Sequence, residues 1–165
     1  MLFRAILLVF AAIFAATIAQ AQGAGLSFGR AFATDSPVEI SSDALTVDQA
    51  TGTATFVGNV LIGQGEMRLS ARQVVVEYGQ KEDGGTKISR LLATGGVTLV
   101  NGPEAAEASR ATYSLDAGTV VMTGDVILTQ GPSAVSGDTL TVDLAQGTGN
   151  MQGNVRTILQ TGSDQ

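Results

Sequence analysis

The chain has 165 residues, a formal net charge of −6, and neither cysteine nor histidine. It therefore offers no disulfide, thiol nucleophile, imidazole base or ordinary zinc site, which excludes most hydrolase mechanisms. Its acidity also disfavours electrostatic binding of nucleic acid. Hydrophobic residues make up 44% of the chain but aromatic residues only 5%, and the 21 glycines favour many short strands with frequent turns over a helical bundle.

The first segment reads as a secretory signal. Arg4 precedes an uncharged apolar run that extends to Ala19, and Ala19-Gln20-Ala21 is a small-x-small cleavage site. We predict a signal peptide over residues 1–21, cleaved after Ala21, and export to the periplasm. The alternative is an uncleaved leader, which would make the chain a membrane-anchored relative. The run is shorter than the roughly 20 apolar residues of a spanning helix and lacks a basic stop-transfer flank.

Three further segments follow the leader. Residues 22–36 are rich in glycine, alanine and serine without a sustained period, and we expect a flexible lead-in that could order on a partner. Pro37 suits the start of an edge strand, so the folded domain is predicted over residues 37–160. Residues 161–165 form a short tail.

A fourfold repeat runs through the domain. In each copy a predicted strand of alternating apolar and polar residues ends on a carboxylate. These carboxylates are Asp48, Glu77, Asp116 and Asp143, so successive copies are 29, 39 and 27 residues apart. A return strand follows with an internal glycine before or near a valine, at Gly58, Gly95, Gly124 and Gly153. Internal periods of this size indicate stacked supersecondary units. The polar stretch 80–87 accounts for the longest step. The strand of the third unit is expected to run from Ala108 to Leu115.

The return strands place their apolar residues at one parity, which predicts a single buried face. These residues are Ala54, Phe56, Val60, Ile62, Leu91, Ala93, Val97, Leu99, Val120, Met122, Val126, Leu128, Met151 and Val155. A glycine inside a strand costs roughly 0.5–1 kcal/mol relative to alanine, so four at matched positions indicate a bend or bulge. The predicted fold is all-β, with about eight to ten antiparallel strands in a sheet that curls around its apolar face.

Two interpretations of that face remain open. An ordinary β-sandwich with a filled core needs the same alternation, and the chain would then be a structural scaffold of the cell envelope. The second interpretation is an open trough that holds a ligand. The scarcity of aromatic rings favours the trough, because aliphatic side chains alone fill a large sheet surface poorly.

Two sequence blocks carry a resemblance to a known family. Residues 56–65 read FVGNVLIGQG and are followed by LSARQVVV at 69–76, while VMTGDVILTQG spans residues 121–131. The two blocks lie in register with the internal repeat. Together they resemble the LptA/OstA-like family of periplasmic lipopolysaccharide-transport proteins, over nearly all of residues 37–160.

The resemblance implies a slightly twisted, open β-jellyroll whose interior carries the acyl chains of lipid A. It implies lipopolysaccharide as cargo, LptC-like inner-membrane and LptD-like outer-membrane jellyroll domains as partners, head-to-tail homo-oligomers, and neither enzymatic activity nor a cofactor. The lipid-facing positions of the family fall on Thr34, Val38, Ile40, Leu99 and Leu115. With the apolar parity, the expected lipid-binding set also includes Phe56, Val60, Ile62, Val97, Met122 and Leu128.

Other features have competing interpretations. The four carboxylates could be paired catalytic acids, but each lies at a strand end, where aspartate commonly bonds to the turn backbone, and we expect turn formation. Gln64 and Gln130 close their strands at equivalent positions, where we expect turn or ladder hydrogen bonds and not sugar recognition. The first strand from Val38 and the last from Val155 to Gln160 are the predicted docking edges, unless Glu39 or Arg156 keeps them apart by charge.

Overall fold

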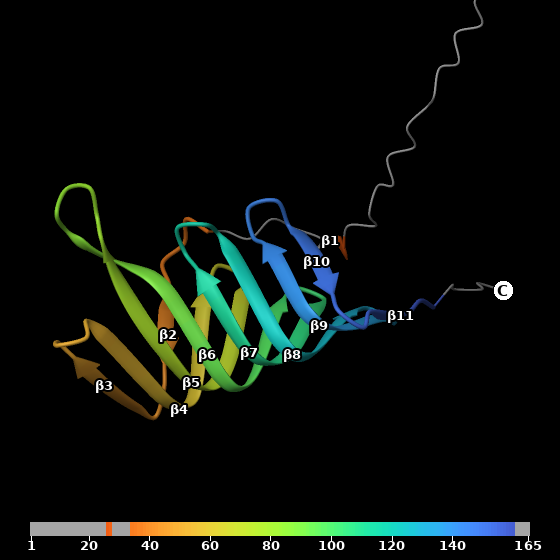
Figure 1. Ribbon diagram of the computed structural model, residues 1–165, viewed down its shortest axis with the longest axis horizontal. Helices are drawn as coiled ribbons and strands as arrows, with labels where there is room; N and C mark the ends of the chain where they lie inside the picture. Colours follow the sequence, from red (N-terminus) through yellow and green to blue (C-terminus); the bar gives the residue numbers. More distant parts are fainter. Residues whose placement is uncertain (1–25, 28–33, 161–165) are drawn as a thin grey trace, which may run out of the picture.

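The computed structural model describes residues 26–27 and 34–160, which form strands and turns (Figure 1). The predicted leader, most of the lead-in and the tail 161–165 lie outside these residues, so leader cleavage stays a prediction. Within the described ranges no helix is long and apolar enough to cross a membrane.

The strands belong to one 11-stranded antiparallel sheet. They are β1 (Leu26–Ser27), β2 (Glu39–Ser41), β3 (Ala44–Asp48), β4 (Thr53–Gln64), β5 (Met67–Gln80), β6 (Thr86–Asn101), β7 (Glu104–Ser114), β8 (Thr119–Gln130), β9 (Ser133–Asp143), β10 (Thr148–Gln152) and β11 (Arg156–Ile158). From β4 to β10 each strand pairs with its sequence neighbour, so the sheet is a meander. β2 and β3 share the outer side of β4 at one end, and β10 and β11 share that of β9 at the other.

Each long strand is divided by a bend, which splits the sheet into two layers. The first layer contains residues 44–48, 53–57, 73–77, 90–94, 110–114, 119–123, 139–143 and 148–152. The second layer contains residues 39–41, 60–64, 67–70, 97–101, 104–107, 126–130, 133–137 and 156–158. The sheet folds along this line of bends and does not close into a barrel (Figure 1). The predicted all-β, open jellyroll architecture is confirmed.

The bends lie at the matched glycines. Gly58, Gly95, Gly124 and Gly153 have φ between +76° and +87°, and the residue after each also has positive φ. The registers shift at the same places, where two residues of β4, β6 or β8 oppose one residue of the next strand. The predicted bulges are therefore present, and they explain why asparagine, aspartate or glycine follows each glycine, since these residues tolerate left-handed backbone.

The first and last bends share one hydrogen-bonded motif. The amide of Asp43 donates to the carbonyl of Gly58 at 2.9 Å, and the side chain of Asn59 donates to the Asp43 carboxylate at 2.8 Å. Asp138 makes the same two bonds with Gly153 and Asn154, both at 2.9 Å. Both ends of the sheet are thus bent in the same way.

Two adjacent glycines at the second bend allow backbone strain and steric contact to be separated. Gly95 and Gly96 have nearly equal φ, +87° and +86°, but a Cβ at Gly95 would lie 2.7 Å from the Arg72 Cβ, whereas none of the neighbouring atoms would approach a Cβ at Gly96. We expect Gly96→Ala to lower the free energy of unfolding by about 1–2 kcal/mol and Gly95→Ala by a further ~1–3 kcal/mol. Urea denaturation of the two variants measures the difference. Equal losses would show that Arg72 does not crowd this bend.

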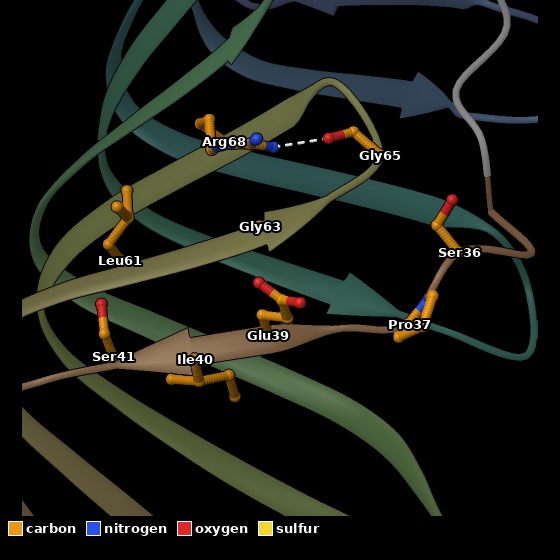
Figure 2. Close-up of a pocket in the computed structure, with 9 residues that line it drawn as sticks. All are labelled: Ser36, Pro37, Glu39, Ile40, Ser41, Leu61, Gly63, Gly65 and Arg68. Atoms are coloured by element: carbon orange, nitrogen blue, oxygen red, sulfur yellow. Dashed lines mark hydrogen bonds between the residues drawn. The ribbon is translucent and has the colours of Figure 1, made fainter.

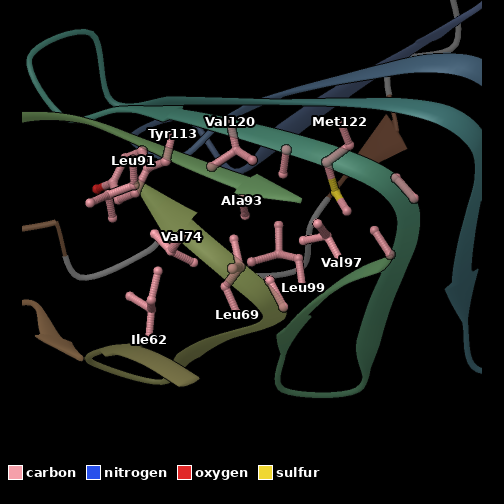
Figure 3. Packing of buried hydrophobic residues seen from close by; sticks show 14 of the residues in the cluster. Ile62, Leu69, Val74, Leu91, Ala93, Val97, Leu99, Tyr113, Val120 and Met122 are labelled. Atoms are coloured by element: carbon pink, nitrogen blue, oxygen red, sulfur yellow. The ribbon is translucent and has the colours of Figure 1, made fainter. Parts of the chain in front are cut away.

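The apolar faces of the two layers pack against each other. Figure 3 shows side chains such as Ile62, Leu99 and Val120 pointing into the space between them. The buried set is almost entirely Val, Leu, Ile, Ala and Met, with Tyr113 as its aromatic member. The single-parity prediction is confirmed at all but one position, because Phe56 and Met151 pack against the cluster and the other predicted residues except Val155 are buried. Val155 is 48% exposed, since it follows the last bend and lies between β10 and β11.

Two details differ from the sequence prediction. The sheet has one strand more than the upper limit of eight to ten, because β1 forms inside the predicted lead-in and pairs with β10. The third unit begins at Glu104, four residues before the predicted Ala108, since alternation in an alanine-rich stretch gives a weak signal.

Candidate functional site

The interior between the layers is the candidate site, and its lining is closed to water. Six of the predicted lipid-facing residues are at most 5% exposed: Val60, Ile62, Val97, Leu99, Met122 and Leu128. The sequence favoured a hollow trough. In the structure the aliphatic side chains of the two layers meet each other instead, so an acyl chain can enter only if the layers move apart.

The remaining candidates lie at the rim of this interior. Val38, Ile40, Phe56 and Leu115 are partly buried and pack against the core cluster. Thr34 is exposed. The structure therefore brings ten of the eleven candidates to one apolar cluster or its border, and it places Thr34 outside, on the segment that leads into β2.

One end of the interior is uncovered. Leu45 and Val47 on β3 pair with Phe56 and Ala54 of β4, so their side chains point to the same face as the core. They are nevertheless 54% and 62% exposed, because β3 is an edge strand with no neighbour beyond it. The apolar interior thus continues to the β2–β3 edge of the domain, where its last residues face solvent.

A polar contact joins the layers on the side opposite the bends, which we call the seam. Tyr113 of the first layer donates a hydrogen bond to Gln64 Oε1 of the second layer at 2.8 Å. Gln64 Nε2 donates to the carbonyls of Thr34 and Ser36 at 2.9 and 3.0 Å. Gln64 is 6% exposed and Tyr113 2% exposed. Burial raises the pKa of the Tyr113 phenol, and the bond to Gln64 partly offsets this.

A separate depression of about 470 Å³ lies beside β2, on the outer face of the second layer (Figure 2). Glu39 and Leu61 line it, and Arg68 donates to the carbonyl of Gly65 at 2.6 Å within it. Both Glu39 and Leu61 are exposed and lie on the face opposite the core. Ile40, at the rim of the interior, also lines this depression, so the depression adjoins the apolar interior at β2.

The repeated carboxylates have structural partners. Asp48 accepts backbone hydrogen bonds from Thr51 and Ala50, which lower its pKa, and Asp143 accepts one from Gln146. The turn prediction is confirmed for these two. Asp116 instead pairs with Lys87 at 2.6 Å and Glu77 with Arg90 at 3.4 Å. Within the described part of the chain no three acidic side chains group as metal ligands would.

Sequence reasoning identified Gln64 and Gln130 as equivalent strand ends but did not find the seam. Gln130 bonds to its cross-strand partner Glu104 at 2.7 Å, as a ladder contact. Gln64 bonds instead to Tyr113, 49 positions away. A usable signal was present, since Tyr113 is a lone ring at an inward-facing position and its phenol needs a polar partner when buried.

This architecture, an open sheet bent along a line of glycines around an aliphatic interior, defines the chain as an open β-jellyroll domain. Residues 39–148 match the family described as LptA/(LptD N-terminal domain) LPS transport protein, which is two thirds of the chain. The chain belongs to this family. Its members are transport proteins and not enzymes.

Relatives with curated sequences agree with this assignment. An uncharacterised protein of Rhizobium meliloti, R00383, is 31% identical over 120 residues, which cover 70% of this chain and 61% of that protein. The lipopolysaccharide export system protein LptA of Escherichia coli K12 is 39% identical over 51 residues, 31% of this chain and 28% of LptA. The chain thus spans less than two thirds of the length of either relative.

A solved structure has the same fold. LptH of Pseudomonas aeruginosa, described as the LptA-homologous periplasmic component of the lipopolysaccharide transport device, superposes with a TM-score of 0.66. The match covers 78% of this chain and 98% of LptH at 16% sequence identity. At this identity the likeness supports the fold alone.

Proposed function

We propose that this chain is a periplasmic lipopolysaccharide carrier that shelters the acyl chains of lipid A between its two layers. The observation that carries the proposal is an aliphatic interior, continuous through the sheet, within a domain of a lipopolysaccharide-transport family. Thr34, Val38, Ile40, Phe56 and Leu115 would meet the lipid at the rim. Val60, Ile62, Val97, Leu99, Met122 and Leu128 would meet it inside.

The energetic case depends on the length of the cargo chains. A saturated chain of a dozen carbons loses on the order of 10 kcal/mol when it moves from an apolar site into water. Free diffusion of such a lipid is negligible, so a carrier must keep the chains covered along the whole path. An interior of Val, Leu, Ile, Ala and Met offers adaptable side chains without a rigid aromatic wall, which suits chains that slide.

The ends of the sheet support the proposed bridge to other jellyroll domains. Edge strands β2 and β3 at one end and β11 at the other carry backbone groups that an added strand could use, and so does the part of β10 beyond its pairing with β1. The exposed Leu45 and Val47 extend the apolar face to the first of these ends. Docking of a second copy, or of LptC-like and LptD-like domains, would cover both side chains and join the two interiors.

Equilibrium binding of a fluorescently labelled lipopolysaccharide to the purified chain tests this function. We expect saturable binding at a fixed stoichiometry, displaced by unlabelled lipid A and not by the delipidated core oligosaccharide, because the acyl chains supply the free energy. Displacement by the oligosaccharide would indicate a sugar site instead. If the labelled lipid fails to bind a chain that is shown to be folded, the scaffold interpretation with a permanently filled core would stand.

A further inference from the structure

The closed interior raises the question of where acyl chains would enter. The two layers are continuous through every long strand at the bends, so they cannot separate there without breaking the sheet. On the opposite side they meet at the seam through side chains. Parting of the layers must therefore begin at the seam, and whatever joins the layers there opposes it.

Gln64 occupies that position with all of its polar atoms engaged toward the seam. Its Oε1 accepts from Tyr113 in the other layer, and its Nε2 bonds to the two carbonyls of Thr34 and Ser36. One buried amide thus holds together the first layer, the second layer and the segment that leads into β2. Figure 2 shows this segment, with Ser36 and Pro37, passing beside the Gly65 turn.

The held segment carries proposed lipid contacts. Thr34 lies at its start, and Val38 and Ile40 follow and pack against the core. β2 has only three residues and sits at an edge of the sheet, so its own backbone pairing is limited. Loss of the Gln64 bonds would leave residues 34–40 attached mainly by this short strand.

We propose that Gln64 is a positioning residue that clasps residues 34–40 and Tyr113 across the seam, and that release of this clasp admits acyl chains to the interior. The proposal rests on the proposed function, since it assigns the point of lipid uptake and the group that controls it. It predicts that weaker clasping speeds uptake without changing how much lipid the interior holds.

The test measures two quantities on each variant: hydrogen exchange at residues 34–41 and the rate of uptake of the labelled lipopolysaccharide. Gln64→Leu removes three hydrogen bonds and keeps a side chain of similar length. We expect both rates to rise at least tenfold, which is the lower end of what the loss of three hydrogen bonds would give, with unchanged stoichiometry. Gln73→Leu, at an exposed position of β5, is the matched control and should change neither rate.

A milder variant keeps the test valid if Gln64→Leu does not fold. Tyr113→Phe removes only the phenol hydroxyl, so it breaks the bond between the layers and leaves those to Thr34 and Ser36. A smaller rise in the rate of lipid uptake is expected.

Tyrosine fluorescence offers a second readout of the clasp. The chain has two tyrosines and no tryptophan, so in a Tyr78→Phe background the fluorescence comes from Tyr113 alone. Quenching of this fluorescence by iodide should increase when Gln64 is replaced.

The outcomes separate the clasp from the function. Faster exchange at residues 34–41 with unchanged uptake would make this segment a simple attachment and would refute the gate. Unchanged exchange in Gln64→Leu would refute the positioning role. A wild-type chain that takes up no lipid would refute the proposed function itself, and exchange and quenching would still decide whether Gln64 holds the segment.

Discussion

Replacement of Leu99 by aspartate is expected to unfold the domain. Leu99 is 1% exposed on β6, and it faces its partners Leu69 and Ala106 inside the core. The change forfeits about 1.5–3 kcal/mol of apolar burial and places a carboxylate where no partner compensates it, so the total loss should reach several kcal/mol. A domain of ordinary stability, about 5–15 kcal/mol, would lose most or all of it. Circular dichroism and urea denaturation measure the outcome.

The neighbouring residue supplies the control for this prediction. Thr98 lies on the same strand with its side chain on the opposite face, and it is only partly buried. Thr98→Asp should retain the folded sheet with a loss below about 1 kcal/mol, in the range of ordinary surface substitutions. A stable Leu99→Asp variant would show that water reaches the interior readily, which would contradict the packed core.

Replacement of Ile40 by aspartate is expected to weaken lipid binding at least tenfold while the domain stays folded. Ile40 lies on the edge strand β2, half-buried at the rim, and pairs with Ile62 of β4. An aspartate carboxylate at position 40 can therefore remain hydrated in the lipid-free protein. An acyl chain that entered would remove that water and leave the carboxylate unpaired, which costs roughly 2 kcal/mol or more and weakens binding at least tenfold. The measurement is the same lipopolysaccharide titration, accompanied by a denaturation curve.

Ser41 offers a matched control, because it is the next residue of β2 and its side chain lies on the outer face. Ser41→Asp adds the same charge to the same strand and should bind lipid as the wild type does. Equal weakening by both variants would point to general repulsion of the anionic lipid. Unchanged binding by Ile40→Asp in a folded protein would argue against Ile40 as part of the lipid path.

Much of the fold could be predicted because it depends on local chemistry. Alternation at period two defines the strands, and it identified the inward-facing residues of β4, β6 and β8. The glycines at 58, 95, 124 and 153 marked the bends, since few other residues tolerate the left-handed backbone there. The β1 strand was missed because a two-residue pairing leaves no periodic signal.

The state of the interior was harder to predict, for a physical reason. Periodicity shows which side chains face inward, but the separation of the layers depends on the bend angle, and that angle determines whether Leu99 or Met122 lines a hollow or fills it. The contact across the seam was also hard to predict, because it too depends on how the bends place the two layers. Gln64 and Tyr113 meet only because the bends bring the two layers together. The sequence around Tyr113 could show that its phenol needs a polar partner, but not that this partner is Gln64.

Strand β1 has a consequence for contacts between copies of this chain. A backbone edge can be used once, and Leu26 and Ser27 already pair with Gly149 and Thr148 of β10. A strand from a second copy can pair with β11 without competition. To pair with the start of β10 it must displace Leu26 and Ser27. Leu26 and Ser27 therefore compete with any neighbour for the Thr148–Gly149 part of this border.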